Sequence, residues 1–227
     1  MIRKLLKLLT RWNDDSYLLF FFIFMCTSVF VIGPLQLEDK FRVFTQPVVS
    51  LMVISGVYAT SKLRWVRWAS ILVAMLDFLV TLINYNVDTF WLEVLDISFT
   101  VIILMFLTGA VLVRVFRDGQ INFYRILGSV SAYVLIGMVF GYLYYLCWLF
   151  QPGSFNFSIP ISTNQDLVGD LSYFSFVTLF TVGYGDINAV MPMARSLATM
   201  EGLIGQLYPV VLIARLVSLE LEANKER

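Results

Sequence analysis

Two glycines at alternate positions make the segment Thr181–Asp186, which is Thr-Val-Gly-Tyr-Gly-Asp, the part of this chain best suited to chemistry. Glycine adopts backbone conformations that are closed to other L-residues, and Gly183 and Gly185 bring this freedom to every second residue. A backbone of this kind can turn successive carbonyl oxygens toward one line, while Val182 and Tyr184 turn their side chains away from it. Carbonyl oxygens in such a row can replace the water shell of an alkali-metal ion. The segment can therefore offer main-chain oxygens to a cation, with a Gly-Tyr-Gly turn in an ordinary loop as the alternative.

The same six residues resemble the selectivity-filter signature of potassium channels. The resemblance runs from about residue 119 to residue 219 and implies an outer helix, a pore helix, a filter and an inner helix. It assigns ion binding to Thr181, Val182, Gly183, Tyr184 and Gly185, with K+ held by the backbone carbonyls of the first four. Because one chain supplies only a quarter of such a ring, the resemblance implies a homotetramer with ions on its central axis.

The resemblance also assigns supporting roles to residues beside the filter. Asp186 is expected to accept a hydrogen bond behind the filter, and Tyr173 stands where the family often carries the aromatic donor of that bond. Thr178, in the expected pore helix, is assigned to filter support as well. Phe180 departs from the family, which usually has threonine at this position, and is expected to narrow or dry the region beneath the filter.

The expected inner helix contains three gating-hinge candidates, Gly202, Gly205 and Pro209. The resemblance places Gly205 at the usual hinge position. A helical glycine loosens the backbone by roughly 0.5–1 kcal/mol relative to alanine, and proline removes a helical hydrogen bond and kinks the helix. Close helix packing at a small residue is the alternative. Glu201, an ionisable residue at filter depth, is expected either to line the cavity or to bond polar groups behind the filter.

Composition places these elements in a membrane. Of the 227 residues, 59% are hydrophobic, and a soluble domain of this size cannot bury so much apolar surface. The formal net charge is zero, which gives no basis for a nucleic-acid partner. The chain has no histidine, and its two cysteines, Cys26 and Cys147, lie in apolar runs without metal-ligand spacing or an expected disulfide. No nucleophile–base constellation is present, so we expect no enzyme, and no cofactor apart from K+ as the permeant ion.

Six apolar segments are long enough to cross a bilayer, at about 17–35, 43–60, 66–83, 90–116, 121–150 and 193–219. A shorter apolar piece, about 171–180, predicts a re-entrant pore helix that starts with the capping and acidic groups of Asp170 and Ser172. The fold class that follows is an all-α integral membrane protein with six transmembrane helices, a re-entrant pore helix and a filter, assembled as a four-fold tetramer.

Basic residues set the expected orientation and domains. With six spans, twelve of the sixteen lysines and arginines gather on one side, and the opposite loops are poorer in positive charge, so that side is cytoplasmic. The twelve are Arg3, Lys4, Lys7, Arg11, Lys62, Arg64, Arg67, Arg114, Arg117, Arg125, Lys225 and Arg227. Both termini are then inside, and the filter lies near the outer face of the cell membrane. The expected domains are residues 1–16 as a basic amphipathic cytoplasmic segment, 17–118 as a four-helix transmembrane domain and 119–227 as the pore domain.

The first four segments resemble the voltage-sensing half of six-helix channels but lack its charge ladder. Ile102–Leu107 is uncharged where that half carries arginines, so strong voltage gating is not expected. Asp77 and Asp96 are the notable acids in these segments. Asp77 is interpreted as a structural hydrogen-bonding group, with a ligand or proton site as the alternative.

The function that follows is passive, potassium-selective conduction. Two alternatives stay open: a potassium uptake transporter subunit, although such chains carry four pore loops and one is visible here, and a non-conducting regulatory membrane subunit. The expected partners are other copies of the chain, membrane lipids and K+. The gating stimulus is left open: it could be lipid, tension, pH, cytoplasmic ions, a regulatory partner chain or the filter itself.

Overall fold

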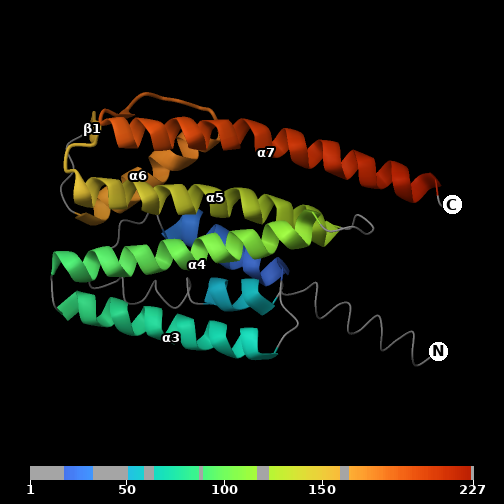
Figure 1. Ribbon diagram of the computed structural model, residues 1–227, viewed down its shortest axis with the longest axis horizontal. Helices are drawn as coiled ribbons and strands as arrows, with labels where there is room; N and C mark the ends of the chain where they lie inside the picture. Colours follow the sequence, from blue (N-terminus) through green and yellow to red (C-terminus); the bar gives the residue numbers. More distant parts are fainter. Residues whose placement is uncertain are drawn as a thin grey trace. The chain divides into compact units, whose positions relative to one another are not determined.

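The computed structural model describes residues 18–32, 51–58, 64–86, 89–116, 123–158 and 164–225. Its elements, in chain order, are the π-helix η1 (Thr27–Ile32), α3 (Arg64–Asn86), α4 (Phe90–Phe116), α5 (Phe123–Phe150), β1 (Phe155–Phe157), α6 (Asn164–Leu179), β2 (Ile187–Ala189) and α7 (Pro192–Lys225) (Figure 1). Residues 18–26 and 51–58 are also helical. The predicted amphipathic segment 1–16 lies outside the described residues.

Three helices are long and apolar enough to cross a membrane: Phe90–Phe116, Phe123–Phe150 and Pro192–Leu219. They confirm the fourth, fifth and last predicted spans. The other apolar stretches in the described helices are shorter, and one of them, Ser70–Val80, lies within α3. The predicted spans at 17–35 and 43–60 extend beyond the described residues, so the number six stays a prediction.

The chain divides into two compact units, and the first comprises residues 1–86, 106–117 and 121–132. Its helices approach closely at Gly56, where an added Cβ would lie 2.7 Å from the Leu107 side chain and 3.1 Å from the Phe21 ring. In the same unit the hydroxyls of Thr27 and Ser28 donate to carbonyls one turn earlier, at 2.8 and 2.9 Å. Such bonds compete with the regular helical pattern, and the π-helix begins at this point.

The second unit comprises residues 87–105, 118–120 and 133–227 and contains the filter segment. Its core is apolar, and five of the twelve members are aromatic: Ile97, Val101, Phe140, Tyr144, Tyr145, Cys147, Phe155, Leu167, Leu171, Phe174, Ile187 and Ala194. Two glycines one turn apart bring α6 against α5. An added Cβ would lie 2.5 Å from the Phe176 ring at Gly137 and 3.1 Å from the backbone of Ser172 at Gly141. Small residues at this spacing allow helices in membranes to approach closely.

Helix α6, the element expected to be a pore helix, is longer than predicted. It begins at Asn164, so the predicted start at Asp170 and Ser172 is wrong, and both residues lie inside α6. The physical reason is that apolar residues at helical spacing continue upstream: Leu167 and Leu171 are buried in the core. The Ser172 hydroxyl donates to the carbonyl one turn earlier at 2.7 Å, as a mid-helix serine commonly does.

A two-stranded antiparallel ribbon, absent from the sequence-based prediction, adjoins the C-terminal end of the filter segment. Strand β1 pairs with β2, with Phe155 opposite Ala189 and Phe157 opposite Ile187. Next to the pair, the Ser158 amide donates to the Asp186 carbonyl at 2.9 Å. Three-residue strands are too short for an alternating pattern to reveal them, and the paired residues lie 30 to 34 positions apart in the chain. The ribbon ties the end of the filter segment to the loop that follows α5.

Candidate ion-coordinating site

The segment between α6 and β2 has an alternating backbone. Thr181, Gly183 and Gly185 have positive φ angles of 57°, 62° and 79°, whereas Val182 and Tyr184 do not. Left-handed backbone is costly for any residue with a Cβ, by roughly 1–2 kcal/mol, and glycine avoids this cost. Alternation between the two hands turns successive amides toward one side of the chain and successive carbonyls toward the other. We call residues 181–185 the filter ribbon.

The amide side of the filter ribbon is tied to the C-terminal end of α6. The Thr181 amide donates to the Thr178 carbonyl at 3.0 Å, and the Val182 and Gly183 amides both donate to the Val177 carbonyl, at 2.9 and 3.4 Å. The last carbonyls of a helix have no partner within the helix. The filter ribbon supplies these partners, and the bonds fix its first three residues against α6.

The carbonyl side of the filter ribbon is open. Within the part of the chain that the structure describes, the carbonyl oxygens of residues 181–184 accept no hydrogen bond. By contrast, the Gly185 carbonyl accepts one from the Asn188 side-chain amide at 2.7 Å, and the Asp186 carbonyl is bonded to the β-ribbon. Side chains on the segment are exposed in the single chain, with Tyr184 at 71% and Val182 at 48%. Four consecutive carbonyl oxygens are therefore available to an external partner.

The C-terminal end of the filter ribbon is fixed by a side-chain pair. The Tyr173 hydroxyl donates to Asp186 Oδ2 at 2.9 Å, which is the pairing that the sequence predicts. Desolvation, together with the bond to Asp186, raises the pKa of Tyr173, so its hydroxyl stays protonated and remains the donor at neutral pH. The bond joins α6 to the end of the filter ribbon across 13 residues of chain.

At the N-terminal end of the filter ribbon, one tyrosine hydroxyl lies within hydrogen-bond distance of two carbonyl oxygens. Tyr133 Oη on α5 lies 2.9 Å from the Leu179 carbonyl oxygen and 3.0 Å from that of Gly205 on α7. The Gly205 carbonyl lacks its usual helical partner because the residue four positions later is Pro209, which has no N–H. Tyr133 occupies the place of the missing donor, and α7 continues as a helix through the proline.

Gly205 lies on α7 against the C-terminal end of α6, which is Leu179. An added Cβ would lie 2.2 Å from the Leu179 carbonyl oxygen, whereas at Gly202 it would meet nothing within 4 Å. Of the two roles considered for Gly205, the geometry therefore supports close packing directly. The hinge role stays a prediction.

Aromatic rings fill the space around this inner contact. The Phe180 ring lies 5.6 Å from that of Tyr133 and 5.6 Å from that of Phe176, and Tyr133 stacks on Tyr208 at 5.2 Å. Phe180 is thus packed on its own chain while part of it stays exposed. Its bulk lies directly before the filter ribbon, where the sequence predicts a narrower or drier region.

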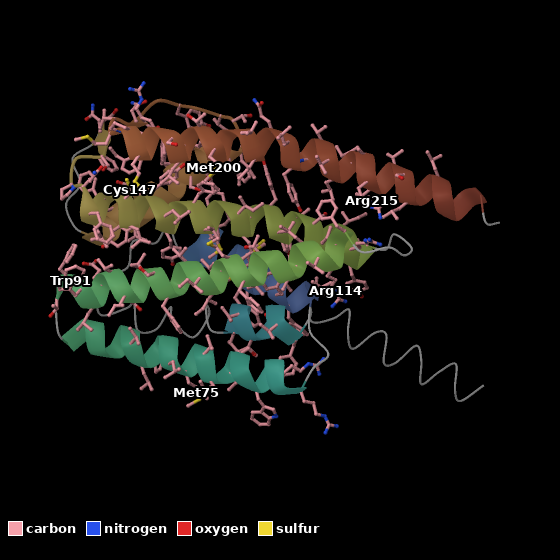
Figure 2. The ribbon with its side chains drawn as sticks, in the orientation of Figure 1. Met75, Trp91, Arg114, Cys147, Met200 and Arg215 are labelled. Atoms are coloured by element: carbon pink, nitrogen blue, oxygen red, sulfur yellow. The ribbon has the colours of Figure 1, made fainter. Side chains whose placement is uncertain are left out.

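Glu201 lies inside the second unit behind the filter ribbon and does not line a cavity. Glu201 is the residue after Met200, which Figure 2 labels on α7. The exposed fraction of Glu201 is 0%. Its carboxyl group is hydrogen-bonded to the Tyr144 hydroxyl on α5 and to the Ser175 hydroxyl on α6, each at 2.5 Å. Of the two expectations for this residue, bonding to polar groups is the one that the structure supports.

Several residues of this site were not found from the sequence. Tyr133, Tyr144 and Ser175 are buried or half-buried polar residues in apolar helices, where a tyrosine or serine at core spacing carries no separate signal. The Gly137-x-x-x-Gly141 pattern on α5 was the readable sign that another helix packs there. Asp96 is buried in the second unit, and Asp77 lies on α3 in the first.

Comparison with protein-family models matches residues 130–221 to a family described as "Ion channel". The matched residues contain most of α5, all of α6, the filter ribbon and most of α7. Searches of curated proteins and of solved structures gave no match. The match supports a general ion channel function, and together with the three apolar helices it shows a membrane protein.

Proposed function

We propose that this chain is one subunit of a homotetrameric potassium channel, in which residues 181–184 of each copy coordinate dehydrated K+ through their backbone carbonyls. One observation carries the proposal: the first three amides of the filter ribbon are bonded to α6, whereas four consecutive carbonyls have no hydrogen-bond partner in the described chain. Polar backbone atoms at membrane depth need partners. A row of cations shared between four such ribbons would supply them.

The selectivity would follow from backbone geometry. K+ gives up its water shell only if oxygen atoms replace it at equivalent distances, and a ring of carbonyls provides these oxygens. Several adjacent sites of moderate affinity then allow one ion to displace the next, which keeps conduction passive and fast. The bonds to Val177 and the Tyr173–Asp186 pair would hold the two ends of each ribbon so that the carbonyls keep their spacing.

The surface of the single chain supports assembly. Only 11% of the apolar window of α7 is buried inside the chain, compared with 67% for α5. The exposed side chains of α7 include Met200, Leu203, Leu207, Val210 and Val211. In the proposed tetramer these residues would face neighbouring copies, the pore and lipid, and the exposed Val182 and Tyr184 would be covered by neighbouring subunits.

The proposal includes a cell-membrane location with both termini inside, six spans and no strong voltage gating. The distribution of lysine and arginine along the sequence supports the orientation. Arg114, in the last turn of α4, is the basic residue of that helix in its described range. A cation at one helix end is suited to anchor the helix at the interface rather than to move through the field.

The test is ion flux from purified protein in liposomes. We expect Rb+ and K+ to pass and Na+ to be excluded. Gly183→Ala should abolish this selectivity, because the φ of +62° is strained by roughly 1–2 kcal/mol for alanine in each of four subunits. Gly202→Ala, at a site where an added Cβ meets nothing within 4 Å, is the matched control and should keep the wild-type ion order. Equal Na+ and K+ flux in the wild type would refute the proposal.

A further inference from the structure

Glu201 joins three helices through a chain of hydrogen-bond contacts that lacks one hydrogen if its carboxyl group is ionised. Its Oε2 lies 2.5 Å from the Tyr144 hydroxyl, and its Oε1 lies 2.5 Å from Ser175 Oγ. The same Ser175 Oγ lies 2.7 Å from the Gly137 carbonyl oxygen on α5. The group therefore forms a chain of four oxygen-bearing partners that runs from α5 through α7 and α6 and back to α5.

Counting hydrogens along this chain identifies the protonation state. A serine hydroxyl carries one hydrogen, a backbone carbonyl carries none and an ionised carboxylate carries none. If Glu201 were ionised, Ser175 could donate to Glu201 or to Gly137, and the other contact would place two oxygens within 2.7 Å with no hydrogen between them. A neutral carboxylic acid removes the conflict: Tyr144 donates to Oε2, Oε1–H donates to Ser175, and Ser175 donates to Gly137.

Burial leads to the same conclusion by a separate route. Glu201 has an exposed fraction of 0%, and within the described ranges no lysine or arginine forms an ion pair with it. Histidine is absent from the whole chain. A buried carboxylate without a cation is strongly disfavoured, and such a group takes up a proton instead.

We propose that Glu201 is held as a neutral carboxylic acid and acts as a positioning residue for the filter ribbon. The positioning role rests on the proposed function, whereas the protonation state does not. Ser175 accepts the hydrogen bond that the neutral Glu201 donates. It lies two residues before Val177 on α6. The Val177 carbonyl holds the amides of Val182 and Gly183. By fixing α6 between α5 and α7, the acid sets the position of that carbonyl and hence of the filter ribbon.

Infrared difference spectroscopy on the purified full chain tests the protonation state directly. Subtracting the Glu201→Gln spectrum from the wild type at neutral pH should leave a carboxylic acid C=O band. Glu93→Gln is the matched control, since Glu93 also accepts a tyrosine hydroxyl, that of Tyr145, but is only part-buried; it should leave the band in place. A carboxylate band pair in place of the acid band would overturn the proposal.

A second variant keeps the test decisive if Glu201→Gln does not assemble. Ser175→Ala removes the acceptor of the acid proton, so the C=O band of the wild type should be replaced by one at higher frequency. A difference spectrum of Ser175→Ala without any change in the acid region would overturn the proposal.

Flux measurements test the positioning role and separate the two proposals. Glutamine can donate to Ser175 and accept from Tyr144, so Glu201→Gln should keep the wild-type Rb+ to Na+ flux ratio, while Glu201→Leu should lower this ratio in the tetramers that remain. Loss of selectivity in Glu201→Gln with the tetramer intact would refute the positioning role by a neutral acid. Equal Rb+ and Na+ flux in the wild type would refute the proposed function and leave the infrared result standing.

Discussion

Replacing Gly205 by alanine tests whether close packing at the end of the pore helix, rather than helix flexibility, is the role of this glycine. The new Cβ would lie 2.2 Å from the Leu179 carbonyl oxygen, 0.8 Å inside the 3.0 Å limit below which real Cβ contacts are essentially never found. The next nearest atoms, at 3.0 and 3.2 Å, are also backbone atoms of Leu179. No rotamer change relieves this collision, so α6 or α7 must move.

The expected cost follows from general magnitudes. Overpacking a close-packed interior costs typically about 1–3 kcal/mol, and a backbone collision belongs at the upper end of that range. Replacing a helical glycine recovers roughly 0.5–1 kcal/mol. The net effect is a destabilisation of about 1–2 kcal/mol per subunit, which acts four times in the proposed tetramer. The displaced carbonyl also lies two residues before Thr181, so the filter ribbon should be disturbed as well.

The assay compares Gly205→Ala with Gly202→Ala, which makes the same chemical change three residues earlier, where a Cβ meets nothing within 4 Å. The fraction of tetramer that survives graded heating in detergent is measured by size-exclusion chromatography, followed by Rb+ uptake into liposomes. We expect Gly205→Ala to lose tetramer and uptake and Gly202→Ala to keep both. If both variants assemble like the wild type and differ only in open probability, flexibility is the role of Gly205 and the packing argument is wrong.

Three further predictions concern the two ends of the filter ribbon and the fourth span. Tyr133→Phe removes the hydroxyl that donates to the Gly205 carbonyl in place of the missing Pro209 amide. The carbonyl is then unpaired, which should destabilise the tetramer by roughly 1–3 kcal/mol. Unchanged heat resistance of the tetramer would contradict this. Tyr173→Phe breaks the 2.9 Å bond to Asp186 and should cost roughly 0.5–1.5 kcal/mol, with conduction still K+-selective but less sustained in single-channel recordings; recordings that match the wild type would contradict it. Conduction should depend weakly on voltage, because Ile102–Leu107 carries no charge and each mobile charge contributes about 2.3 kcal/mol per 100 mV; steep activation in planar bilayers would refute this.

The filter ribbon was predictable because its signal is local. Glycine is required at the positions where the backbone must be left-handed, and the structure has positive φ at Gly183 and Gly185. Thr181 shares that conformation although it has a Cβ, and no single-residue rule identifies it. The spans at α4, α5 and α7 were predictable for a similar reason, since a run of about 20 apolar residues is sufficient evidence.

The contacts behind the filter ribbon were not predictable because they join residues that are distant in the chain. Tyr144 and Glu201 are 57 residues apart, and Tyr133 and Gly205 are 72 apart. A tyrosine in an apolar helix gives no sign of which carbonyl or carboxyl group it will meet. The start of α6 was misplaced because Gly169 and Asp170 interrupt the apolar run, although the buried Leu167 continues the helical spacing.

Anomalous diffraction from crystals grown in Rb+ tests the coordination by the filter ribbon most directly. We predict a row of anomalous peaks on a four-fold axis, each ringed by the carbonyl oxygens of residues 181–184 from four chains. A chain that crystallises as a lone protomer, or a tetramer whose axis carries no Rb+ beside these carbonyls, would contradict the account.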